Sequence, residues 1–201
     1  MTLSSRLWSA NSDLAAQALA HPFVSRLGDG SLERQRFAAF IAQDAFFLDA
    51  FARAYALALV RAPDTATVLV LADLISGVRD ELGLHAAYAA SLGIDLAAVA
   101  PAPATTAYTD FLLAVAATSA DGLIYAAMTP CMRLYAFLGS TLNPDDAGPY
   151  ADWVRTYGNG DFEALATRLE QLVDDRDPDP TAAGPLYRRA MTLELAFFDA
   201  N

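Results

Sequence analysis

The stretch LGDGSLERQRFAAFIAQDAFFLDAFARAYALALV, residues 27 to 60, indicates how this chain folds. GDGS is typical of a turn, with Ser31 as a helix N-cap, and the apolar residues that follow recur every three or four positions. One face of the predicted helix carries Phe37, Phe40, Ile41, Asp44, Phe47, Leu48 and Phe51. Pro63-Asp64 is expected to end this long amphipathic helix.

Helical spacing continues along the rest of the chain. A second long helix is expected over residues 65 to 91, and APAPATT (100 to 106) predicts a rigid connection before a helix that ends near residue 118. Asp121 and Gly122 open the next segment, and further helices are expected over 150 to 157, over 161 to 175 and at the C-terminal end. About seven or eight helices without a strand predict an all-α, single-domain bundle over residues 1–201.

Charge and composition exclude several classes of protein. The chain has 201 residues, of which 55% are hydrophobic, so one sizeable core is expected. The net charge is −11, and the 13 basic residues are all arginines scattered along the chain, which argues against binding to DNA or RNA. The absence of lysine excludes a lysine Schiff base and a Walker-type phosphate loop.

The chain shows no sign of a membrane or secreted protein. Its best apolar run, residues 111 to 128, is interrupted by SADG into pieces too short to span a bilayer, and the first residues lack a hydrophobic signal region. A single cysteine excludes an intramolecular disulfide. The cytoplasm is therefore the expected compartment.

The only cysteine, Cys131, stands in MTPCMRLYAF, residues 128 to 137. If a helix starts here, Thr129 is its N-cap, Pro130 occupies the first turn, and the helix dipole lowers the pKa of the thiol. If the helix runs through, Pro130 instead leaves a backbone carbonyl unpaired. Tyr135 lies one turn further on. Cys131 can be a nucleophile or a small buried core residue.

Two carboxylates stand among apolar neighbours. Asp44 lies on the apolar helix face beside Phe47, where it can bind the N–H groups of an amino-substituted aromatic ring or form an ion pair with Arg53 or Arg79. Glu194, in MTLELAFF, is either an acid/base group with a raised pKa or an exposed helix position.

Other polar residues favour structural roles when each is considered alone. Glu81 and His85 have the E-x-x-x-H spacing that also occurs in di-iron bundles, but only His21 remains as a further histidine, so a hydrogen-bonded pair is preferred to a metal site. Tyr108 and Tyr157 are typical packing residues whose hydroxyl groups find partners.

Six strings occur in an order typical of one family: HPFVSRLGDGSLERQRFAAFIAQDAFFLDAFAR, RDELGLHAAYAASLGI, TTAYTDFL, MTPCMRLYAF, YADWVRTYGNGDFEAL and LELAFF. With them the chain resembles the TenA family, the thiaminase II group, over essentially its whole length. The resemblance implies an all-helical, haem oxygenase-like fold, commonly assembled as a homotetramer, and an enzyme that needs no metal or organic cofactor.

The resemblance also implies a role for each candidate residue. Cys131 matches the catalytic cysteine, Asp44 the aspartate that holds the pyrimidine amino group and a ring nitrogen, and Glu194 the glutamate near the leaving group. The implied pocket-lining residues are Phe47, Tyr108, Tyr135 and Tyr157. Glu81 and His85 match a pair expected to be structural or to support the residues that touch the substrate. Phe47 lacks the hydroxyl of the commoner tyrosine, and Met132 and Arg133 stand where aromatic residues are frequent.

The implied activity is aminopyrimidine aminohydrolase. The expected substrate is 4-amino-5-aminomethyl-2-methylpyrimidine, with thiamine as a second candidate, and the product is hydroxymethylpyrimidine for thiamine salvage. Cys131 would add to the ring and Glu194 would act as acid and base. Two alternatives remain open: an oxidoreductase on the same fold, and a regulatory protein that binds a pyrimidine without turnover.

Overall fold

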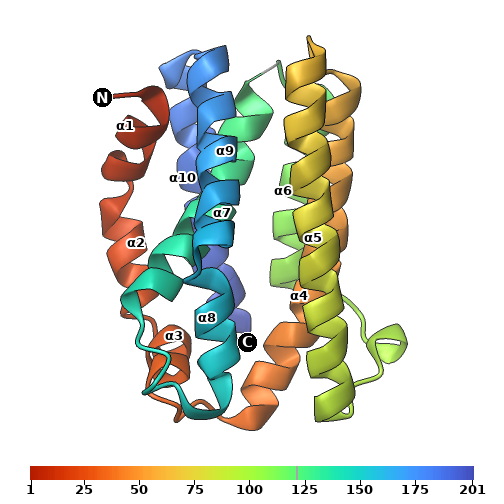
Figure 1. Cartoon of the computed structure of the whole chain (residues 1–201), viewed down its shortest axis with the longest axis vertical. Coiled ribbons are helices and arrows are strands. Elements are labelled where there is room, and N and C mark those ends of the chain that lie inside the picture. The colour runs from red at the N-terminus through yellow and green to blue at the C-terminus, as the bar shows by residue number, and fades with distance from the viewer. Residues whose placement is uncertain (121) are drawn as a thin grey trace.

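The computed structural model describes residues 1–120 and 122–201, and within them the chain is helical without a strand (Figure 1). The α-helices are α1 (Leu3–Ala10), α2 (Ser12–Leu19), α3 (Pro22–Gly28), α4 (Arg34–Val60), α5 (Thr65–Leu92), α6 (Pro103–Thr118), α7 (Leu123–Thr141), α8 (Ala151–Tyr157), α9 (Gly160–Arg176) and α10 (Pro180–Ala200). Two short 3-10 turns are η1 (Leu96–Ala98) and η2 (Gly148–Tyr150). The predicted all-α class is confirmed.

Two details of the predicted helices are wrong. The expected number is too small, because the described residues before Gly30 already form α1, α2 and α3. Ser31 is not an N-cap: α4 begins at Arg34 after Glu33, and the Ser31 hydroxyl donates instead to Asp29 Oδ1 at 2.5 Å. The predicted turn is present, but its serine binds Asp29 within the turn and caps no helix.

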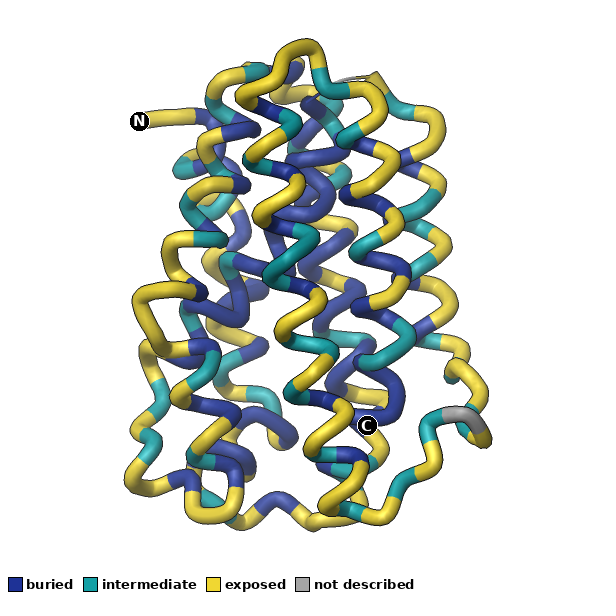
Figure 2. The backbone as a smooth tube through the Cα atoms, turned by 45° about the vertical axis from the view of Figure 1, so that its right-hand side comes forward, coloured by how far each residue is buried: buried dark blue, intermediate teal, exposed yellow. Residues whose placement is uncertain are grey.

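The long helices form two groups that share one core. Helix α4 packs on α5 and α6, whereas α7 packs on α9 and α10 (Figure 1). The buried backbone segments lie inside the bundle and the exposed turns lie outside (Figure 2). Across the described residues, no helix combines the span and the hydropathy that crossing a bilayer requires.

Local signals explain where the long helices begin and end. The Asp64 carboxylate accepts the Thr67 N–H at 2.8 Å and caps the start of α5. Gly93 ends α5 with φ of 74°, a left-handed conformation that favours glycine. Pro103 stands in the first turn of α6. The predicted bounds of α5 and the end of α6 therefore agree with the structure.

Helix α7 runs through Pro130, so the second of the two interpretations of this segment is correct. The Thr129 hydroxyl donates to the Tyr125 carbonyl at 2.7 Å and does not cap a new helix. Cys131 therefore lies inside a helix, away from its positive end. The alternative in which a helix N-terminus activates the thiol is wrong.

Close packing of α8 against α7 places Tyr157 beside the middle of α7. A Cβ atom on Gly139 would lie 2.4 Å from the backbone nitrogen of Gly158 and 2.4 Å from the Tyr157 carbonyl carbon. Only glycine permits this approach. The Tyr157 ring then lies 4.9 Å from that of Tyr135, measured between centroids.

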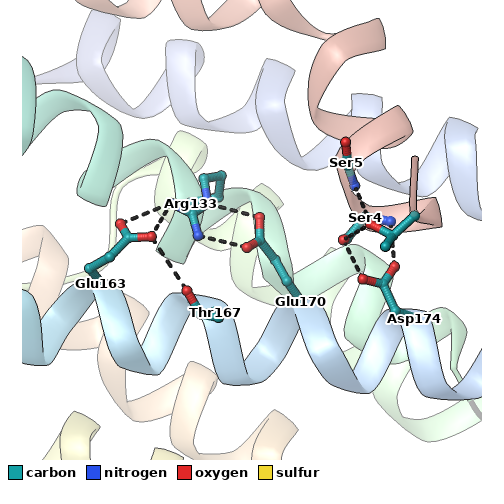
Figure 3. A network of polar contacts seen from close by, with 8 residues as sticks. Ser4, Ser5, Arg133, Glu163, Thr167, Glu170 and Asp174 are labelled. Atoms are coloured by element: carbon teal, nitrogen blue, oxygen red, sulfur yellow. Dashed lines mark hydrogen bonds and ion pairs between the residues drawn. The ribbon is translucent and has the colours of Figure 1, made fainter.

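An ion-pair cluster joins α7 to α9 (Figure 3). Arg133 binds Glu170 through two hydrogen bonds of 2.8 and 2.6 Å and Glu163 through two of 2.8 and 2.9 Å. We call these three residues the Arg133 cluster. Nearby, Ser4 donates its N–H and its hydroxyl to Asp174, each at 2.8 Å, which holds α1 against α9.

Candidate active site

A small internal cavity lies where α4, α5, α7, α8 and α9 meet, and we call it the site cavity. Its volume is about 10 Å³, close to what a single water molecule needs. Its lining residues are Asp44, Phe47, Leu48, Phe51, Glu81, Cys131, Met132, Tyr135, Tyr157 and Phe162. Six residues singled out from the sequence are thus brought to one space from four helices.

The Cys131 thiol, in the middle of α7, interacts with the carboxyl group of Glu194, in the C-terminal part of α10. The Tyr108 hydroxyl of α6 donates to Glu194 Oε1 at 2.7 Å. Glu194 and Tyr108 are 2% and 1% exposed, so the alternative of an exposed glutamate is wrong. Sulfur, carboxyl and phenol therefore form one buried polar cluster beside the site cavity.

Burial sets the pKa values of Cys131 and Glu194. It raises the pKa of the Cys131 thiol well above its usual range, and the charges of Glu194, Glu81 and Asp44 add to the rise. Burial also raises the pKa of Glu194 to about 8, against the hydrogen bonds from Tyr108 and Cys131. The resting sulfur is therefore a thiol, and the neighbouring Glu194 is a carboxyl group whose pKa of about 8 lies near neutral pH.

Asp44 forms its ion pair with His85 and not with an arginine. His85 Nε2 donates to Asp44 Oδ2 at 2.6 Å, with both residues buried. Arg53 binds Asp49 and Arg79 binds Asp80, so the predicted ion pairs of Asp44 with arginine are wrong.

In the Asp44–His85 pair, His85 carries a positive charge close to the site cavity. Burial opposes protonation of His85, but the charge and hydrogen bond of Asp44 outweigh it and raise the pKa of His85 to about 9. His85 Nδ1 donates its proton to the Glu81 carbonyl at 2.9 Å, which fixes the ring. The imidazolium therefore orients one carboxylate oxygen of Asp44 and balances its charge.

Glu81 has a more direct position than the predicted supporting role. Its carboxyl group lines the site cavity and accepts a hydrogen bond from the Tyr157 hydroxyl. Burial and the charge of Asp44 raise the pKa of Glu81 to about 7, against the opposing effects of His85 and Tyr157. The site thus contains a second carboxyl group that exchanges its proton near neutral pH.

Aromatic rings form the apolar walls around these polar groups. The Phe47 ring lies 4.7 Å from the Tyr108 ring, and Tyr157 meets Phe162 edge-on at 4.9 Å, measured between centroids. Flat rings at such spacing suit a planar, aromatic ligand. Tyr108 itself reaches the site through Glu194 and does not line the site cavity.

Sequence reasoning missed three residues around the site. Tyr55 continues the helix face of Asp44 and Phe51 and so had a signal in its spacing, but the analysed face stopped at Phe51. Met132 was noted only as a departure from the aromatic residues frequent in the family, and Phe162 carried no signal beyond its hydrophobicity. Met132 and Phe162 line the site cavity, and Tyr55 lies with them along a second space between α5, α8 and α9.

Neither ring nitrogen of His85 is available to bind a metal in this arrangement, because one is directed to Asp44 and the other to the Glu81 carbonyl. Within the described part of the chain, no group of three or more His, Cys, Asp or Glu side chains has the arrangement of a metal site. Glu81 and His85 are therefore linked by the hydrogen bond from the His85 ring to the Glu81 backbone carbonyl.

Comparisons with known proteins agree with the predicted family. The family described as TENA/THI-4/PQQC matches residues 8–176. The aminopyrimidine aminohydrolase of Halalkalibacterium halodurans is 33% identical over 209 residues, which cover 100% of this chain and 91% of that protein. The mitochondrial bifunctional TH2 protein of Arabidopsis thaliana is 34% identical over 99% of this chain, but the chain spans only 37% of its length.

Solved structures agree with the fold. A TenA family transcription regulator from a Silicibacter species superposes with a TM-score of 0.91 at 27% identity, covering 98% of this chain and 95% of that one. Haem oxygenase-1 from Synechocystis superposes with a TM-score of 0.64 at 17% identity, covering 100% of this chain and 92% of that one. The haem oxygenase-like fold is thus confirmed.

Proposed function

The chain belongs to the TENA/THI-4/PQQC family, and we propose that it is an aminopyrimidine aminohydrolase of the thiaminase II type. The proposed reaction replaces the amine of 4-amino-5-aminomethyl-2-methylpyrimidine by a hydroxyl group and yields hydroxymethylpyrimidine for thiamine salvage. The observation that carries the proposal is the convergence of the buried Cys131 thiol, Asp44 and Glu81 on one cavity, with the buried Glu194 carboxyl group interacting with the thiol.

Asp44 would recognise the aminopyrimidine. A carboxylate can accept two parallel N–H groups, and the 4-amino group next to a protonated ring nitrogen presents such a pair. His85 already occupies Oδ2 and fixes the orientation of the group. The raised pKa of Glu81 keeps a carboxyl proton close to the ring, where it can neutralise a ring nitrogen as the sulfur adds.

Addition of sulfur starts the proposed reaction. The Cys131 proton passes to the Glu194 carboxylate while the sulfur bonds to the ring carbon next to the substituted one, and the displaced electron pair moves to a ring nitrogen that takes a proton. The high pKa of the thiol makes this base necessary. Glu194 then carries the proton that the leaving amine requires.

Departure of the amine and attack of water complete the reaction. The ring electrons expel the amine, which takes the proton of Glu194, and leave an exocyclic methylene group. Water adds to this group and gives its proton to Glu194. The nitrogen proton is released, the sulfur departs with its electron pair, and Glu194 returns the proton to Cys131. The walls of the buried site exclude bulk water from the reactive intermediate.

The test is turnover of 4-amino-5-aminomethyl-2-methylpyrimidine, followed by chromatography of the hydroxymethyl product. Wild type is expected to form it, whereas Cys131→Ala is expected to lose at least about a thousandfold in kcat with an unchanged circular dichroism spectrum. Tight binding of the pyrimidine without turnover would favour the regulatory alternative. Full activity of Cys131→Ala would reject the proposed chemistry.

The cytoplasm and a homotetramer remain part of the proposal. Thiamine salvage places the enzyme where pyrimidine phosphorylation takes place, and the resemblance to the TenA family implies the tetramer. Fractionation of cells and sedimentation of the purified protein test these two points separately.

A further inference from the structure

Gln43 stands one residue before Asp44 in α4, and the proposed reaction does not use it. Its side chain is buried and faces the segment that leads into α6. Gln43 Nε2 donates to the Ala100 carbonyl at 3.1 Å. Gln43 Oε1 accepts the Ala102 N–H at 2.8 Å and the Thr105 hydroxyl at 2.7 Å. A single amide thus holds both the end of the preceding loop and the first turn of α6.

The start of α6 depends on this amide because alanine stands at its N-cap. Ala102 offers no side-chain acceptor to a helix N–H. Pro103 presets one backbone angle of the first turn but ties that turn to no neighbouring helix. The hydroxyl of Thr105, which is 1% exposed, would lose its acceptor without Gln43. Gln43 therefore supplies from α4 a contact that the local sequence of α6 does not supply.

The anchored turn leads directly to Tyr108. Thr105 and Tyr108 are three residues apart in α6, so they lie on the same face of that helix, and both are buried. Phe47, one turn after Gln43 in α4, contacts the Tyr108 ring with centroids 4.7 Å apart. A polar contact and an aromatic contact, one turn apart on both helices, thus join α4 to α6. Together they fix the rotation of α6 about its axis and its shift along that axis, and hence the place of the Tyr108 hydroxyl.

The Tyr108 hydroxyl needs an accurate position because its acceptor is Glu194. Their hydrogen bond is 2.7 Å long, and such bonds weaken steeply when their length or angle departs from the optimum. This bond lowers the pKa of Glu194, whereas burial and the charge of Asp44 raise it. Among the described residues, the titratable groups that face Glu194 are Asp44 from α4, Tyr108 from α6, and Cys131 and Tyr135 from α7.

We propose that Gln43 and Thr105 are positioning residues: they anchor the first turn of α6 so that Tyr108 keeps its hydroxyl on the Glu194 carboxyl group. Neither residue lines the site cavity, and neither takes part in the bond changes. The consequence for turnover rests on the proposed function, in which Glu194 accepts the thiol proton and passes it to the leaving amine. The consequence for the Glu194 carboxyl group does not rest on it and can be measured without a substrate.

Infrared difference spectroscopy during a pH titration follows the protonated carboxyl group of Glu194, and Glu194→Gln identifies its band. Gln43→Leu removes the three hydrogen bonds of the anchor, and Thr105→Val removes one hydroxyl at constant volume. Both are expected to raise the pKa of Glu194 by about half a unit or more, as is Tyr108→Phe. Thr105→Ser keeps the hydroxyl and should restore the wild-type pKa. Thr109→Val is the matched control, because this hydroxyl donates within α6 itself, and it should leave the pKa unchanged.

Turnover of 4-amino-5-aminomethyl-2-methylpyrimidine gives the second readout. In Gln43→Leu, kcat is expected to fall by about tenfold. KM should change by less than about twofold, because Asp44 binds the ring and stays paired with His85. The rise of kcat/KM with pH should move to higher pH together with the pKa of Glu194. In a Tyr108→Phe background, Gln43→Leu should cost about twofold or less, because both changes act on the same hydrogen bond.

The outcomes separate the inference from the proposed function. If the pKa of Glu194 moves as expected in a protein that converts no aminopyrimidine, the inference is supported and the proposed function is rejected. An unchanged pKa of Glu194 in Gln43→Leu and Thr105→Val, or additive losses of kcat in the double variant, would overturn the inference and leave the anchor a role in stability alone. Thermal unfolding identifies failed folding. If Gln43→Leu does not fold, Thr105→Val and Thr105→Ser decide by the same criteria.

Discussion

Two polar clusters on α7 differ in how far their carboxyl groups are paired with positively charged side chains. In the Arg133 cluster, one guanidinium faces two glutamates, and the hydrogen bonds to Glu170 and Glu163 outweigh burial and raise the pKa of Arg133 (Figure 3). Cys131 lies two residues before Arg133 and faces the opposite side of α7. The carboxyl groups near it are those of Asp44, Glu81 and Glu194, and His85 pairs with Asp44 alone.

The difference lies in how far positive charge compensates the carboxylates. The Arg133 cluster is compensated and joins α7 to α9. In the site, His85 balances Asp44, but Glu81 and Glu194 have no arginine, and burial raises their pKa values to about 7 and about 8. Incomplete compensation leaves two carboxyl groups able to exchange protons near neutral pH, which is what acid/base catalysis requires.

The largest expected effect comes from Glu194→Gln, which keeps the shape of the side chain but removes its proton exchange. We expect kcat to fall by about 10² to 10⁴-fold. Wild-type kcat/KM should rise with pH toward about 8, where Glu194 becomes the carboxylate that accepts the thiol proton, and the variant should lose this rise. Steady-state kinetics across pH 5 to 10, a range of about five units around that pKa, measure both.

Glu170→Gln is the matched control for this prediction. It neutralises a glutamate in the Arg133 cluster, on the other side of α7, and should leave kcat within about twofold. A comparable loss in both variants would contradict the distinction between the two clusters.

The next effect concerns the Asp44–His85 pair. His85→Ala leaves a buried carboxylate without its partner and should lower the free energy of unfolding by about 3 to 5 kcal/mol. His85→Gln retains a neutral donor and should recover part of the loss. His21→Ala, which removes a histidine paired with the exposed Asp199, should cost much less. Urea unfolding compares the three variants, and equal losses would show that Asp44 does not depend on His85.

Arg133→Met should have a smaller effect, confined to stability. The variant leaves Glu170 without its two hydrogen bonds, and the free energy of unfolding should fall by about 1 to 3 kcal/mol. The kcat for the proposed substrate should stay within about twofold of wild type. Arg53→Met, which breaks an exposed pair with Asp49, should cause a still smaller change. A large loss of turnover in Arg133→Met would assign this cluster to the site.

The last effect is the pH dependence of stability that Glu194 contributes, which is a slope along the pH scale and not a single step. The pKa of Glu194 is raised from 4.5 to about 8 in the folded chain, so between these values the folded state holds a proton that the unfolded state has lost. Stability should therefore fall as pH rises through this window, by up to about 1.4 kcal/mol per pH unit. Glu194→Gln should flatten this slope, whereas Glu163→Gln, in the Arg133 cluster, should not. Thermal unfolding between pH 5 and pH 8 measures it, and identical slopes in wild type and Glu194→Gln would contradict the buried, protonated carboxyl group.

The sequence allowed much of the fold to be predicted, because α4 and α5 have long apolar faces and clear end signals. It failed where local signals compete. The helices before Gly30 are short and rich in serine and alanine, and Pro130 fits either the start or the interior of a helix. The resemblance to the TenA family named the candidate residues, but charge partners depend on packing. The partner of Asp44 lies 41 residues away, on α5, where spacing along one helix carries no information.

The site cavity was likewise beyond sequence analysis. It depends on how α7, α8 and α9 approach one another, and the close contact at Gly139 is visible only in three dimensions. Met132 and Phe162 line the cavity because of that packing and not because of a motif.

The central claim is that an aminopyrimidine lies between the compensated carboxylate of Asp44 and the uncompensated pair of Cys131 and Glu194. A crystal structure of the complex with 4-amino-5-hydroxymethyl-2-methylpyrimidine, the proposed product, tests it directly. The account predicts the amino group on Asp44, the hydroxyl group on Glu194 and the Cys131 sulfur beside the ring carbon next to the substituted one. A ring bound elsewhere, with the site cavity still closed and the side chains of Cys131 and Glu194 unmoved, would contradict it.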